Sequence, residues 1–196
     1  MDLAAPFKKE VLRPFITLLV PGAIATGPFV LILGDYVPSV AKFWVEHVYP
    51  FTALLIISVL AAGFIIDDIG ANIEAHVWDT IIGRRDQQHK ANWEAYLKLQ
   101  MQDELIGQRY LDDKVIQLKF ELAMATALVI FWVGLAWLQV LHKIWSGTGF
   151  SLVTGFLLVG VAYLLWESWQ TANLLSKTRA WILKAIEDGP KGFNAA

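Results

Sequence analysis

The sequence predicts an all-α, polytopic membrane protein: a four-transmembrane-helix bundle whose long helices extend into a small cytoplasmic helical layer. The 196-residue chain is 56% hydrophobic, with a mean hydropathy of +0.49, which is too apolar for a water-soluble domain. Four segments of 18 to 20 residues contain no Asp, Glu, Lys, Arg or His: 15–33, 49–66, 122–141 and 147–166. A helix of about 20 apolar residues spans the hydrocarbon core of a bilayer, which is roughly 30 Å thick.

The distribution of Lys and Arg predicts the orientation. Segments 1–14, 67–121 and 167–196 contain three, seven and four of the 16 basic residues, which leaves only Lys42 and Lys143 on the opposite side. Because positively charged connections stay in the cytoplasm, we expect a multi-pass protein of the cell membrane with both termini cytoplasmic.

The composition also excludes several classes of function. The chain has no cysteine, which excludes disulfides, thiolate metal sites and cysteine nucleophiles. Its net charge is −2, so no concentrated basic surface points to a nucleic acid partner. The sequence contains no Gly-rich phosphate loop, GxSxG elbow or zinc signature, and we expect no cofactor.

The first apolar segment, 15–33, is irregular because prolines recur every seven residues from Pro14. We expect a kinked helix that packs through Ala23 and Gly27. The alternative is a broken helix that lines an ion site, but such sites come with ionisable or strongly polar neighbours, which this segment lacks.

The same region has the parts of a cleavable signal peptide: basic residues, an apolar run and the small residues Ala23 and Ala25. The apolar run continues to Leu33, so cleavage after Ala25 would leave half a membrane segment behind. A retained first span is therefore favoured over cleavage.

The second segment, 49–66, ends in Ala61, Ala62 and Gly63, small residues that allow close helix contact. Beyond it, apolar residues continue at spacings of three and four, which predicts one helix to Gly83. These residues are Ile66, Ile69, Ile73, Val77 and Ile81. We expect three of them, Ile69, Ile73 and Val77, to pack against the third helix at Val115 and Leu118.

Similar stripes predict a third helix over 108–142 and a fourth helix that continues until Asp188, Gly189 and Pro190 end it. A short apolar segment connects the second and third helices within the cytoplasmic layer. Its residues are Trp93, Tyr96, Leu97 and Met101.

The densest polar cluster follows the second segment and comprises Asp67, Asp68, Glu74, His76 and Asp79. Carboxylates and a His at a membrane surface can bind a divalent metal or a lipid headgroup. Asp68, Glu74, His76 and Asp79 are thus candidate catalytic residues, and the first three are candidate metal ligands. Their spacing matches no metal motif, so we favour ion pairs with Arg109, Lys114 and Lys119 of the third helix.

Arg84 and His89 have an Arg-x4-His spacing, which resembles the motif of HEPN-type ribonucleases. The resemblance covers only residues 84–89 and implies an Arg and a His that cleave RNA at a dimer interface. We favour a solvated basic turn at the tip of a helical hairpin.

Two further sets of residues have ordinary structural interpretations. Asp103, Glu104, Arg109, Asp112 and Asp113 read as a helix start rather than a cation site, because acidic residues favour the positive end of a helix. Ser151 and Thr154 have no neighbouring base, and Ser151 with Gly155 fits close helix packing better than nucleophilic catalysis.

Three classes of function fit these features. We favour a protein that acts non-catalytically by self-association in the lipid bilayer, as a pore-forming or membrane-perturbing effector or as a membrane-complex subunit. A cytoplasmic protein partner on 67–121 or the C-terminal helix is compatible with this class. The alternative is a membrane-surface enzyme that uses the cluster 67–79 on a lipid or with a divalent metal. An ion-coupled transporter is disfavoured, because the apolar segments lack ionisable residues.

Overall fold

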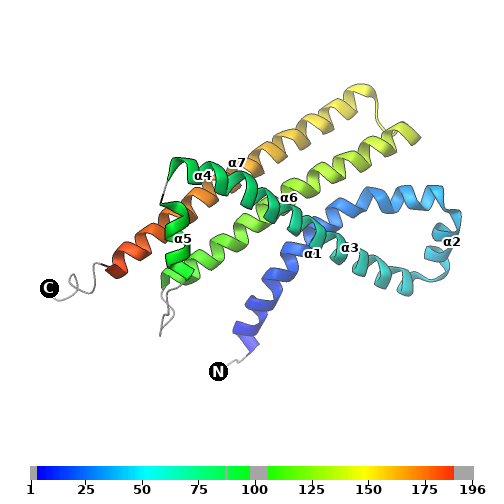
Figure 1. Ribbon diagram of the computed structural model, residues 1–196. Helices are drawn as coiled ribbons and strands as arrows, with labels where there is room; N and C mark the ends of the chain where they lie inside the picture. Colours follow the sequence, from blue (N-terminus) through cyan, green and yellow to red (C-terminus); the bar gives the residue numbers. More distant parts are fainter. Residues whose placement is uncertain (1–3, 87, 98–105, 188–196) are drawn as a thin grey trace.

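The computed structural model describes residues 4–86, 88–97 and 106–187, and every element within them is helical, which confirms the all-α prediction. Figure 1 shows the arrangement of these helices. They are α1 Ala4–Tyr36, α2 Pro38–Glu46, α3 Val48–Ile73, the π-helical turn η1 Glu74–Trp78, α4 Asp79–Arg85, α5 His89–Leu97, α6 Ile106–His142 and α7 Gly147–Glu187.

Within the described residues, four helical stretches are long and apolar enough to cross a membrane, as predicted. They are Phe15–Tyr36, Val48–Arg85, Tyr110–His142 and Gly147–Lys184. The first belongs to one continuous helix, α1, which changes direction along its length but is not interrupted at Pro21 or Pro28 (Figure 1). The broken-helix alternative is therefore wrong.

The chain folds into two helical hairpins, α1–α3 and α6–α7, which meet where α1, α3 and α6 converge. The buried residues at this junction are Ala25, Ile66, Ala123 and Ala127. Small side chains let the helix backbones come together: a Cβ on Gly22 would lie 2.1 Å from the carbonyl oxygen of Val59. The α1–α3 crossing therefore depends on glycine.

The connection after the first segment is not a simple loop. It forms α2, which begins at Pro38, a residue suited to a first helical turn because its missing N–H would have no partner there. Trp44 of α2 stacks on Phe51 with ring centroids 5.1 Å apart. At the same end of the protein, His142 Nε2 lies 2.6 Å from Asp35 Oδ2 and links α6 to α1.

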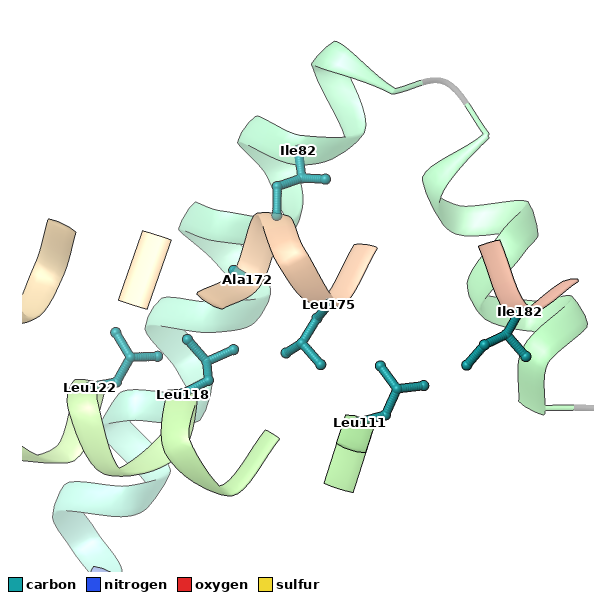
Figure 2. Close-up of a cluster of buried hydrophobic side chains, with 7 residues drawn as sticks. All are labelled: Ile82, Leu111, Leu118, Leu122, Ala172, Leu175 and Ile182. Carbon is teal, nitrogen blue, oxygen red and sulfur yellow. The ribbon is translucent and has the colours of Figure 1, made fainter. Parts of the chain in front are cut away.

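Where the helices extend beyond the apolar segments, they share a second hydrophobic core (Figure 2). It is formed by Ile82 of α4, by Leu111, Leu118 and Leu122 of α6, and by Ala172, Leu175 and Ile182 of α7. Trp78 of η1 and Tyr96 of α5 pack against this cluster. The core thus brings four separate parts of the chain together around one centre.

The turn η1 changes which residues of the second helix face this core. Ile73 packs against it as predicted, but Ile69 and Val77 are 39% and 41% exposed, so that part of the prediction is wrong. A π-turn inserts one extra residue into the helical repeat. The inward positions after Ile73 are therefore Trp78 and Ile82, each one residue later than the apolar stripe predicts.

Candidate functional site

Charged side chains gather around a cavity of about 760 Å³ beside the second core. The two acidic residues are Glu74 on η1 and Asp79 at the start of α4. The four basic residues each come from a different helix: Arg84 of α4, Lys90 of α5, Lys119 of α6 and Arg179 of α7. The hydrophobic core behind the cavity fixes the positions of these helices, and Figure 1 shows α4 and α5 beside the distal half of α7.

His89 connects three helices at the edge of this cavity. Its Nδ1 shares a hydrogen bond of 2.9 Å with Ser176 Oγ of α7, and its Nε2 lies 3.6 Å from Asp79 Oδ1 of α4. The three residues resemble a Ser-His-Asp arrangement only in type. Ser176 is buried and does not line the cavity, so its hydroxyl is not presented to a substrate. The contacts instead hold the start of α5 against α4 and α7.

Arg179 lies half-buried under Trp93, with its guanidinium carbon 3.9 Å from the ring centroid, a cation–π contact. Burial lowers the pKa of Arg179, while the negative charges of Asp79 and Glu74 act in the opposite direction. Burial also raises the pKa of Glu74, as does the nearby charge of Asp79, against the effect of Lys119 and Arg179. Glu74 and Arg179 lie outside the charge-free segments 49–66 and 147–166.

The raised pKa of Glu74 predicts a specific pH dependence of stability. The folded protein disfavours the charged carboxylate of Glu74. The contribution of Glu74 to the stability of the fold is therefore fully present below the ordinary pKa of 4.5, and it is lost as the pH rises through the folded-state pKa. Replacing Glu74 with Gln should remove this decline. In thermal unfolding, E74Q should be more stable than the parent protein at neutral pH and equal to it below pH 4.5. A difference that is constant across this range would contradict the assignment.

Two of the four candidate catalytic residues on the second helix reach the cavity. Glu74 and Asp79 line it, but Asp68 and His76 are exposed and do not. His76 Nδ1 lies 3.0 Å from the carbonyl oxygen of Asn72 on its own helix. Among the residues that the structure describes, no three His, Asp or Glu side chains are grouped to hold a metal ion. The three candidate ligands Asp68, Glu74 and His76 are therefore not brought together in this arrangement.

Among the described residues, no ion pair within 4 Å joins the acidic residues of the second helix to Lys114 or Lys119. Lys119 lines the same cavity as Glu74 and interacts with it electrostatically, whereas Lys114 Nζ donates to Gln117 Oε1 at 2.7 Å. Gln117 Nε2 in turn donates to Glu121 at 2.6 Å, and Thr171 Oγ1 of α7 donates to the same carboxylate at 3.1 Å. Glu121 is only 5% exposed, and sequence reasoning missed it. The sequence feature that could have revealed Glu121 is its position as a single carboxylate directly before the charge-free segment 122–141.

The basic turn combines two different environments. Arg84 is exposed, as a solvated turn requires, but the His89 side chain is only 11% exposed and has contacts on both ring nitrogens. The solvated-turn interpretation is right for Arg84 and wrong for His89.

The predicted packing residues Ala23, Gly27, Ser151 and Gly155 are all exposed. A Cβ on Gly27 or Gly155 would have no neighbour within 4 Å among the described residues. Of the other polar set, Asp112 and Asp113 are exposed on α6. Met101, Asp103 and Glu104 lie outside the described residues, as does the side chain of Arg109.

Comparison of the chain with known protein families, with curated proteins and with solved structures finds no match.

Proposed function

We propose that the protein is a non-catalytic membrane protein that acts by self-association, as a pore-forming or membrane-perturbing effector or as a subunit of a membrane complex. The main support is the free surface of α7. None of residues 147–167 is buried, and Leu152 and Phe156 are 71% and 79% exposed. One side of this apolar stretch contacts α6, and the rest is available to lipid or to a second copy of the chain.

Small residues on this surface favour the second copy. Apolar side chains are already well solvated by lipid, so helices associate in membranes by close packing at small residues. The crossing of α1 and α3 uses Gly22 and Gly63 for this purpose. Gly155 of α7 and Gly27 of α1 have the same capacity, but nothing in the described part of the chain lies within 4 Å of a Cβ built there. We therefore infer that α7, through Ser151 and Gly155, provides the main contact between copies.

Replacing Gly155 with Leu tests this contact. The variant should still insert into membranes, because apolarity rises, but the oligomer should be lost since the two backbones can no longer approach. Crosslinking and native mass spectrometry measure the assembly. Val140→Leu is the matched control, since it changes an exposed apolar side chain on α6, outside the proposed α7 contact, and should leave the oligomer intact. A parent protein that is monomeric in both detergent and nanodiscs would overturn the proposal.

An enzyme acting at the membrane surface is the second candidate. It is supported by the placement of Glu74 and Asp79 on one cavity and by the raised pKa of Glu74. If activity on a lipid is found, E74Q and D79N should abolish it without changing the oligomer. Loss of activity with loss of the oligomer in G155L alone would favour the first proposal.

We also propose that both termini and segment 67–121 face the cytoplasm, since 14 of the 16 basic residues would then lie there. The absence of cysteine makes single-cysteine labelling direct. An impermeant reagent applied to intact cells should label a cysteine at Lys42 but not one at Gln88. The reverse pattern would mean the opposite orientation.

A further inference from the structure

We propose that the cavity between α4, α5, α6 and α7 binds a phosphate group, carried either by a lipid headgroup or by a soluble phosphate ester. The inference concerns the helical layer, and it does not depend on self-association of the apolar segments.

Positive charge from separate parts of the chain converges on this cavity. Four basic side chains line the cavity, and each belongs to a different helix: Arg84, Lys90, Lys119 and Arg179. Among the described residues, Arg84, Lys90 and Lys119 have no carboxylate within 4 Å. Like charges brought together from four helices repel one another unless an anion lies between them. A phosphate presents three or four oxygens and can accept from several such donors at once.

The two acidic residues on the cavity do not cancel this charge. Asp79 lies beside His89, and both Asp79 and Glu74 act on the half-buried Arg179. With four basic and two acidic side chains, the lining of the cavity carries an excess of positive charge.

The size and position of the cavity fit a phosphorylated headgroup. Its volume of about 760 Å³ lies within the range of about 300–1,000 Å³ that is usual for small-molecule sites. Lys119 is three residues from the third apolar segment, or about 4.5 Å along the helix, at the level of lipid phosphates. Glu74 lies eight residues, or about 12 Å, beyond the second segment. The cavity thus extends from the phosphate layer outward, and Trp93 and Val115 provide an apolar part of its lining. Basic pockets between membrane helices bind anionic headgroups in this way.

The experiment uses the full-length protein and two probes. Inorganic phosphate is added to the detergent-solubilised protein, and thermal unfolding measures whether it stabilises the fold. In parallel, the protein is placed in nanodiscs of phosphatidylcholine alone or of equal parts phosphatidylcholine and phosphatidylglycerol, and native mass spectrometry counts the lipids that stay bound. Stabilisation by phosphate in detergent supports a soluble ligand. Selective retention of phosphatidylglycerol without that stabilisation supports a lipid.

Three variants locate the effect in the cavity. The double variant R84Q/K90Q should weaken binding of the effective probe by about tenfold or more, since each charge-assisted contact is lost. E74Q should strengthen binding by about two- to fivefold, because it removes a negative charge from the same cavity. R85Q is the matched control: Arg85 is the neighbour of Arg84, but its guanidinium lies over Trp169, away from the cavity.

A gain in E74Q cannot result from misfolding, so the two opposite shifts together test the cavity rather than general stability. The proposal is overturned if neither probe binds the parent protein. It is also overturned if R84Q/K90Q binds as well as R85Q does.

Discussion

Replacing Gly63 with Ala is expected to destabilise the protein by about 3 kcal/mol, the upper end of the usual cost of over-packing. A Cβ at this position would lie 2.3 Å from the carbonyl oxygen of Leu18 and 2.9 Å from its carbonyl carbon. These are backbone atoms of α1, which cannot rotate away as a flexible side chain can. The helices α1 and α3 would have to separate, and their contacts along the crossing would weaken.

Gly27→Ala is the control for this prediction, because it makes the same chemical change in the apolar part of α1 where nothing lies within 4 Å. Thermal unfolding of the purified protein in detergent should show a large loss for G63A and no loss for G27A. Gly22→Ala should behave like G63A, since it meets the carbonyl oxygen of Val59 from the other side of the crossing. Equal stability of G63A and G27A would mean that α1 and α3 do not cross at these glycines.

Of the two glycines at the α1–α3 crossing, the sequence pattern predicted Gly63 but not Gly22. The small residues that end at Gly63 were correctly expected to allow close helix contact. On α1, however, the expected residue was Gly27, and the structure uses Gly22. Both glycines lie in the same apolar helix near prolines, so composition does not distinguish them. The crossing with α3 decides which one is buried.

The candidate site was predictable in part for a similar reason. The acidic residues Glu74 and Asp79 belong to one helix, so their proximity follows from helical spacing. Lys90 and Arg179 are far apart in sequence and meet because α5 folds back against α7. No local pattern encodes that return, which depends on the packing of Trp93 and Tyr96. The cavity could therefore be derived only from the fold.

The turn η1 provides the sharpest test of the structure against the sequence pattern. The apolar stripe predicts that Val77 faces the core, whereas the π-turn places Val77 outside and turns Ile82 inward, where it is 4% exposed. Ile82→Ala should cost about 2–5 kcal/mol, because it opens a cavity against Leu118 and Leu175 in the second core (Figure 2).

Val77→Ala should cost less than about 1 kcal/mol, because an exposed side chain leaves no cavity behind. Denaturant or thermal unfolding of both variants in detergent provides the comparison. The reverse order of costs, with Val77→Ala the more damaging, would mean that the helix continues through residues 74–78 without an extra residue. The register of α4 would then shift, and Asp79 and Arg84 would turn away from the positions that line the cavity. A stability measurement on two apolar residues therefore tests the geometry of the charged site beside them.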